Sequence, residues 1–182
     1  MIKNLEEIMY QMSDLFMAPV LVLIIILFIY SLYSLGVFGA QAIQRYTNRV
    51  QFKSLLLQVG NSSGKPEIKG YLLISMALAN PNISRDELDV AAFKSLEGVR
   101  VVSRLAPMLG LIATMVPMGP ALKSLADGNV QGISENLIIA FSAVIFGLVI
   151  ASITFWIASV RKRWLATELV AIASNRPGGN AA

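Results

Sequence analysis

Three polar side chains stand in otherwise apolar stretches of this sequence, and their types are suited to guiding a cation. Thr114 is the lone hydroxyl near the middle of the uncharged stretch from Leu105 to Leu122. Glu135 begins the next apolar stretch, and Ser142 follows two helical turns later and so shares its face. Ionisable groups within a membrane usually mark ion routes. Together these residues predict a narrow polar seam that carries H⁺ or Na⁺.

Each of these residues also has a purely structural interpretation. A hydroxyl in an apolar helix often donates a hydrogen bond to its own backbone, and Glu135 is suited to complement the positive end of a helix in its first turn. A proton path also needs a titrating carboxylate near the membrane midplane, and the apolar stretches contain none. Either there is no path, or another polypeptide supplies the carboxylate.

The composition is that of a membrane protein. Hydrophobic residues make up 55% of the chain and charged residues only 14%, against about 25% charged in soluble domains. Charge is absent from residues 15–44, 105–122 and 136–160, and a helix needs about 20 apolar residues to span the hydrocarbon. The first run is too long for a signal peptide and no basic segment precedes it. We therefore expect three transmembrane helices.

Several chemistries are excluded by residue types that the chain lacks. It has no cysteine and no histidine, so disulfides, thiolate chemistry, ordinary zinc or haem sites and histidine-based catalysis are unavailable. We expect no enzyme activity, no catalytic residues, no metal site and no cofactor. The net charge of +4 does not indicate nucleic-acid binding, because the basic residues follow the membrane topology.

The basic residues are distributed unequally among the segments that connect the spans. Only Lys3 precedes the first span and only Lys123 lies between the second and third, whereas nine lie from Arg45 to Arg104 and four follow residue 160. Lysine and arginine accumulate in cytoplasmic loops. This predicts a multi-pass membrane protein with an external N-terminus and a cytoplasmic C-terminus.

Local patterns divide the chain further. Apolar residues at helical spacing before the first span indicate an amphipathic helix on the outer surface, either a membrane anchor or a gate that contacts a partner. Ser84 and Glu87 have the spacing of a capping box, from which a helix runs into the second span. The expected segments are the surface helix 1–15, the first span 16–40, a cytoplasmic helical segment 41–98, the second span 99–126, an external hairpin 127–132, the third span 133–160 and a cytoplasmic tail 161–182.

The second and third spans each carry a stripe of small residues, unlike the first. Small residues four positions apart allow close approach of helices in lipid. The stripes favour an inner layer made by these two spans, with the first span outside; generic packing within one chain is the alternative. The stripes consist of Ala106, Gly110 and Thr114 in the second span, and Ala143, Gly147 and Ala151 in the third.

Two motifs resemble those of the MotA/TolQ/ExbB proton-channel family. Residues 107–115, with the sequence PMLGLIATM, resemble the PLLGLLGTV signature of that family, and residues 132–137, GISENL, resemble the start of its last helix. The resemblance covers roughly residues 93–164. Three spans with an external N-terminus resemble ExbB and TolQ rather than MotA, which has four.

The resemblance implies a ring-forming protein in the cytoplasmic membrane of a prokaryote. With the segments expected above, the predicted fold class is an all-α integral membrane protein with three transmembrane helices, two of them extended into the cytoplasm. In that family the subunits, usually five, surround single-span helices of a partner of the ExbD, TolR or MotB type. The partner brings an aspartate into the pore, which is the carboxylate this chain lacks. By resemblance, Thr114 matches the pore hydroxyl, Glu135 the acid that starts the last helix, and Pro107 and Gly110 the structural positions of the signature.

The chain also departs from the family pattern. The second pore hydroxyl of the family falls at Ala140, and Ser142 is the nearest substitute. Pro117 and Pro120 replace residues that are usually small or apolar, and we expect them to distort the outer half of the second span. Despite these departures, the resemblance implies ion-driven energy transduction. A non-conducting scaffold ring and an unrelated small transporter are the alternatives.

Overall fold

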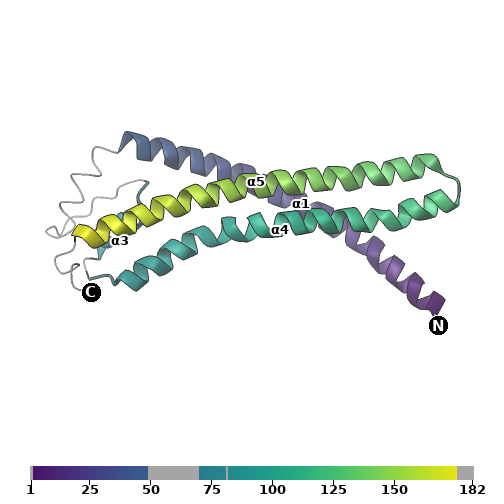
Figure 1. The fold of residues 1–182 in the computed structure, drawn as a ribbon, viewed down its shortest axis with the longest axis horizontal. Coiled ribbons are helices and arrows are strands. Elements are labelled where there is room, and N and C mark those ends of the chain that lie inside the picture. The colour runs from purple at the N-terminus through teal and green to yellow at the C-terminus, as the bar shows by residue number, and fades with distance from the viewer. Residues whose placement is uncertain (1, 49–69, 81, 176–182) are drawn as a thin grey trace. The chain divides into compact units, whose positions relative to one another are not determined.

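The computed structural model describes residues 2–48, 70–80 and 82–175 (Figure 1). Every regular element in this part of the chain is a helix: α1 (Ile2–Thr47), α3 (Leu72–Ala79), α4 (Arg85–Ala126) and α5 (Val130–Asn175). Three stretches are long and apolar enough to cross a membrane, at Leu15–Thr47, Arg85–Ala126 and Val130–Ser174. The expected all-α integral membrane protein is confirmed.

Helix α1 includes the segment that the sequence suggested as a separate surface helix. It runs without a break from Ile2 to Thr47 and contains Pro19. No glycine or proline precedes Pro19, so no helix-breaking residue separates the first fifteen residues from the span. Placement of these first turns on the outer membrane surface stays a prediction. The helical continuation expected through Lys53 and the turn at residues 61–66 lie outside the described residues.

Helix α4 begins at the predicted capping box. The backbone N–H of Glu87 donates to Ser84 Oγ, and the backbone N–H of Ser84 donates to Glu87 Oε2, each over 3.1 Å. This reciprocal pair satisfies two donors that would otherwise lack partners at the start of the helix. The predicted box is confirmed.

Helix α4 then continues for 42 residues. At about 1.5 Å per residue it is roughly twice as long as the hydrocarbon core of a bilayer. It contains Pro107, Pro117 and Pro120, each of which removes one backbone hydrogen bond. The distortion expected from the last two prolines therefore does not end the helix.

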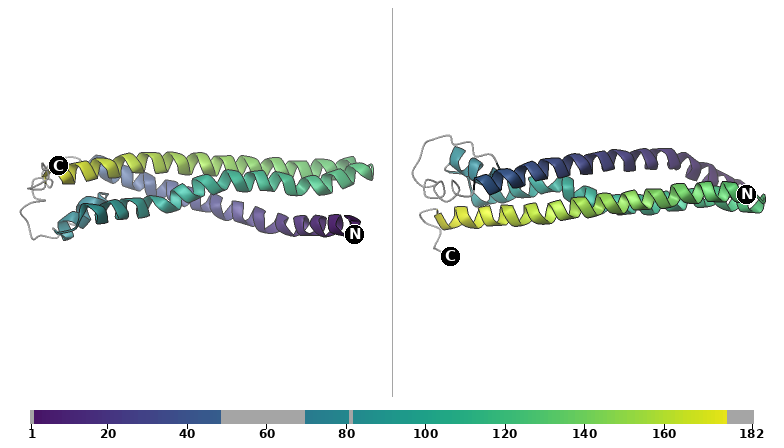
Figure 2. Two further views of the ribbon diagram at one scale, coloured as in Figure 1. Left: turned by 60° about the horizontal axis from the view of Figure 1, so that its bottom comes forward. Right: turned by 90° about the horizontal axis from the view of Figure 1, so that it is seen from above.

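The chain divides into two compact units, and each has its own core. The first comprises residues 1–33 and 101–155, and the second residues 34–100 and 156–182. Within the first unit, α4 and α5 lie side by side (Figure 2). The core of this unit contains Ile24 of α1, Val102, Ala106 and Ala113 of α4, and Ala143 and Ile150 of α5.

Two glycines of the small-residue stripes allow α4 and α5 to approach closely. A Cβ atom placed on Gly147 would lie 2.8 Å from the carbonyl oxygen of Ala106 and 3.2 Å from Cα of Gly110. Real Cβ atoms do not approach a backbone that closely, so only glycine allows this separation. The stripes therefore pack against each other within one chain.

Gly147→Ala is expected to destabilise the first unit, because the added methyl group would meet the backbone of α4. Overpacking of this kind costs about 1–3 kcal/mol, measurable as a lower unfolding temperature by circular dichroism in detergent. Gly36→Ala is the matched control, since nothing lies within 4 Å of its new Cβ and alanine favours a helix. Equal unfolding temperatures for the two variants would contradict the tight contact.

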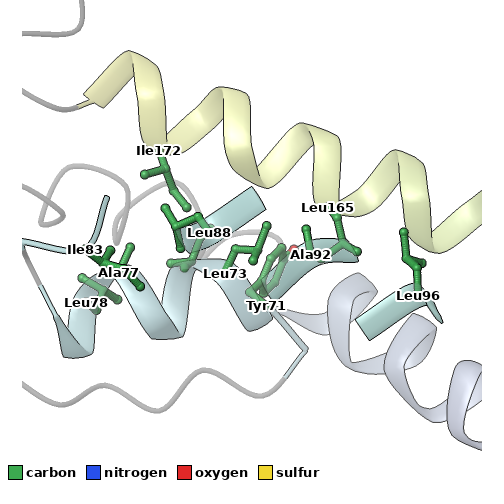
Figure 3. Packing of buried hydrophobic residues seen from close by; sticks show 11 residues of the cluster. Tyr71, Leu73, Ala77, Leu78, Ile83, Leu88, Ala92, Leu96, Leu165 and Ile172 are labelled. Carbon is green, nitrogen blue, oxygen red and sulfur yellow. The ribbon is translucent and has the colours of Figure 1, made fainter. Parts of the chain in front are cut away.

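The second unit is built around the short helix α3. Its buried apolar side chains meet those from the start of α4 and the end of α5, as Figure 3 shows for Leu73, Leu88 and Ile172. The cluster also includes Tyr71, just before α3. Two members of this core, Leu73 and Tyr71, contact the ion pair of the second unit that is described below.

Candidate functional site

The two predicted seam hydroxyls both donate to their own helices. Thr114 Oγ1 donates to the carbonyl oxygen of Leu111 over 2.6 Å, and Ser142 Oγ donates to that of Ile138 over 2.7 Å. Thr114 is half-buried and Ser142 is exposed. A hydroxyl whose proton is used in this way can still accept a hydrogen bond. Each oxygen can therefore receive a proton donor or contact a hydrated cation from outside the chain.

Glu135 is not a first-turn acid. Helix α5 begins at Val130, and its first turn contains no acidic residue. The helix start is capped by Asn129, whose Oδ1 accepts from the backbone N–H of Gly132 over 3.0 Å. Because the helix dipole acts mainly within the first turn, it does not account for a carboxylate in the second. Glu135 is exposed, and its Oε1 accepts from Gln131 Nε2 over 3.1 Å.

No hydrogen bond joins the three predicted seam residues among the described parts of the chain. All three belong to the first unit, Thr114 on α4 and the other two on α5. Ala140, where the resemblance placed a second hydroxyl, is only 3% exposed, whereas Ser142 is exposed. Ser142 therefore lies on a different side of α5 from the position it was expected to replace.

Two buried hydroxyls in the first unit did not emerge from the sequence reasoning. Thr154 is fully buried and donates to the carbonyl oxygen of Ile150 over 2.7 Å. Ser31 is also fully buried and donates to that of Phe28 over 2.8 Å. A hydroxyl that replaces its hydration with a bond to its own helix is stable in an apolar core. Thr154 follows Gly147 by seven residues and therefore lies on the small-residue face of α5. That spacing is the sequence signal that could have predicted its burial.

The main polar group missed by the sequence analysis is a buried ion pair in the second unit. Glu168 of α5 is 1% exposed, and its Oε1 pairs with Nη2 of Arg45 near the end of α1. Its other oxygen, Oε2, accepts from the backbone N–H of Leu73 over 2.9 Å. Tyr71, at the N-cap of α3, makes no capping bond with its side chain. Glu168 therefore caps α3 from another helix while it neutralises Arg45.

Aromatic rings enclose the arginine. The guanidinium carbon of Arg45 lies 4.7 Å from the centre of the Tyr71 ring and 4.6 Å from that of Trp164. Both distances fall within the range of cation–π attraction, which is strongest for desolvated groups. Phe38 stacks on Trp164 with their ring centres 5.2 Å apart. The two aromatic faces and the Glu168 carboxylate together compensate for the cost of burying the guanidinium.

A weak sequence signal for this pair exists. Glu168 is the only acidic residue after residue 160, and Arg45 is the first charged residue after the uncharged run 15–44. Those facts mark both residues as unusual, but they do not connect two positions 123 residues apart. The connection becomes visible only when α1 and α5 are placed together in the second unit.

Comparison with known proteins supports the resemblance found in the sequence. The model of the MotA/TolQ/ExbB proton channel family matches residues 79–173. This range contains all three predicted seam residues and Glu168, but not Arg45. No curated protein and no solved structure matches the chain.

Proposed function

Because this chain belongs to the MotA/TolQ/ExbB proton channel family, we propose that it is the ring-forming subunit of an ion-driven energy-transducing complex in the membrane. H⁺ or Na⁺ passes along a pore that this subunit forms with a partner, and the gradient is converted into mechanical work. The family comprises proton-channel components and is not a class of enzymes. The chain is proposed to be multi-pass with an external N-terminus. The orientation rests on the concentration of basic residues in residues 45–104 and after residue 160, because such residues accumulate on the cytoplasmic side.

The observation that carries this proposal is the extent of the family match. It covers α4 and almost all of α5, the two helices on which the polar residues of the apolar stretches lie. Thr114 is half-buried, whereas Ser142 and Glu135 are exposed. Side chains in these positions remain available to a surface formed by several subunits. In the proposed ring, usually of five copies, Thr114 lines the pore.

The missing carboxylate is assigned to the partner. Members of this family generally work in oligomers with a single-span protein of the MotB, ExbD or TolR type. Here the partner is proposed to carry a transmembrane aspartate. Its proton is accepted and released beside Thr114, whose oxygen remains free to accept a hydrogen bond. Glu135, at the far end of the path, attracts the entering cation.

The decisive experiment is capture of the complex from its native membrane through a tag on this chain. We expect a single-span membrane protein with an aspartate in its span to copurify. Reconstituted in liposomes under a pH gradient, the complex should conduct, whereas the chain alone should not. Flux is read from a pH-sensitive dye inside the liposomes.

The alternatives predict different results in the same assay. A complex with the partner bound but without flux of H⁺ or Na⁺ identifies a scaffold ring. Transport by the chain alone identifies a small transporter, although the chain has no inverted repeat and no charged residue at the midplane of its spans. Either result would overturn the proposed motor.

A further inference from the structure

One face of α4 in the second unit carries apolar side chains that the chain itself leaves uncovered. Phe93 is 63% exposed, and Val90 and Glu97 are exposed as well. Residues three and four positions apart share one side of a helix, so these three form a single stripe. The stripe lies on the side of α4 away from Leu88 and Ala92, which are buried in the core of the second unit.

Lipid does not cover this α4 stripe. Residues 85–104 contain eight charged side chains, so this part of the helix lies outside the hydrocarbon, where charge is costly. An apolar patch rimmed by charged residues is typical of a contact with another protein.

A second stripe, on α5, has a matching composition. Val170 is 69% exposed, and Ala166 and Arg163 are exposed on the same side of the helix. The order is base, small residue and apolar residue, whereas the α4 stripe reads apolar residue, large ring and acid. Among the described residues, no ion pair joins Arg163 to Glu97.

The two stripes lie at matching heights along the second unit. Leu88 of α4 packs near Ile172 of α5 in its core (Figure 3), and a short hairpin makes the two helices antiparallel. Counted by equal numbers of residues from this pair, the first residue of the α4 stripe is level with the last residue of the α5 stripe. The acid of α4 is level with the base of α5 in the same way.

We propose that the α4 stripe of one copy of this chain packs against the α5 stripe of the next copy. Rotation about an axis normal to the membrane leaves heights unchanged, so residues that are level in one chain meet between neighbours. Two different faces are in contact, and such heterologous contacts can close into rings. The inference rests on the ring of the proposed function. The three facing pairs are Val90 with Val170, Phe93 with Ala166, and Glu97 with Arg163.

The pairs complement each other in size and in charge. The large ring of Phe93 meets the small side chain of Ala166, and an acid meets a base. An exposed ion pair contributes little to stability, but complementary charges select one register over others. The pair of Glu97 and Arg163 therefore sets which heights of neighbouring copies meet.

The test uses the absence of cysteine from this chain. The double variant Phe93→Cys with Ala166→Cys is oxidised in native membranes and separated on a non-reducing gel. A disulfide needs Cα atoms within about 7 Å of each other, so only a direct contact between copies joins chains. We expect a ladder of covalent multimers, whereas each single variant stays monomeric because the contact joins two different faces.

The matched control is Phe93→Cys with Ser174→Cys. Ser174 is exposed and shares the face of Ala166, but it lies two turns, or about 12 Å, farther along α5. We expect no ladder from this variant. Multimers from a single variant, or equal ladders from the two double variants, would overturn the contact.

Charge reversal tests the register in the same double-cysteine chain. Glu97→Arg places two cations opposite each other and should slow cross-linking about fivefold. Adding Arg163→Glu restores opposite charges and should restore the rate. Lys162→Glu in place of Arg163→Glu is the control, because Lys162 is exposed but lies on another side of α5. Equal recovery in both charge-swapped variants would contradict the pairing.

Failure of this inference is distinguishable from failure of the proposed function, since cross-linking needs neither the partner nor ion flow. If an assembled complex conducts but gives no ladder through residues 93 and 166, the contact is wrong and the proposed function stands. If the ladder forms in a complex that does not conduct, the contact is supported and the motor is not.

Discussion

Thr114→Val is expected to lower gradient-driven ion flux strongly while leaving assembly intact. Valine has nearly the same shape as threonine, so the helix and its packing are preserved, but the oxygen that accepts a hydrogen bond is lost. A hydrogen bond to a charged group contributes about 1.5–3 kcal/mol, which corresponds to about ten- to hundredfold in rate. The measurement is dye-detected proton flux in liposomes that contain this chain and its copurified partner.

Thr114→Ser is the matched control, because it keeps the hydroxyl and removes only a methyl group. We expect it to retain most of the flux. The oligomer mass of both variants in detergent should equal that of the wild type, since the hydroxyl bonds only to Leu111 of its own helix. Undiminished conduction in Thr114→Val would remove this residue from the path.

Glu168→Ala is expected to destabilise the second unit strongly. It leaves the Arg45 guanidinium, only 14% exposed, without its counter-charge and leaves the N–H of Leu73 without its acceptor. Removing one partner of a buried ion pair costs about 3–5 kcal/mol. The change should appear as a lower unfolding temperature in tryptophan fluorescence, to which Trp164, lying against the arginine, contributes.

A double variant separates the contribution of the ion pair to stability from the cost of leaving one buried partner unpaired. The double variant Arg45→Met with Glu168→Met should recover much of the stability, because apolar replacement of a buried ion pair is often neutral. Glu97→Ala on α4 is the control: its side chain is exposed, and surface changes usually stay within about 0.5 kcal/mol. If the double variant is no more stable than Glu168→Ala, the arginine has another indispensable contact.

The features predicted correctly from sequence depend on neighbouring residues. The three spans follow from uninterrupted apolar runs, and the capping box follows from Ser84 and Glu87 three positions apart. The small-residue stripes also follow from local spacing. Only the structure shows that residue 147 must be a glycine because the backbone of α4 of the same chain lies against it. Such patterns are short in range, so a single sequence is sufficient to recognise them.

The features that escaped prediction depend on distant residues or on competing local signals. Glu168 lies within the predicted tail 161–182 and was not singled out, because its partners, Arg45 and Leu73, lie on other helices. The structural alternative placed Glu135 in the first turn because the third span was predicted to begin at residue 133, whereas α5 begins at Val130. Pairing between subunits and with the partner lies beyond any one chain, so the pore itself remains a proposal.

The separation of Arg45 and Glu168 by 123 positions also has a consequence for synthesis. A ribosome makes α1 first and α5 last, so the arginine enters the membrane boundary long before its carboxylate exists. Throughout that interval the guanidinium of Arg45 must stay hydrated or pair with another counter-ion. A chain interrupted before residue 168 would lack the counter-charge of the arginine and the acceptor for the N–H of Leu73. The ion pair can therefore form only after residue 168 has been synthesised.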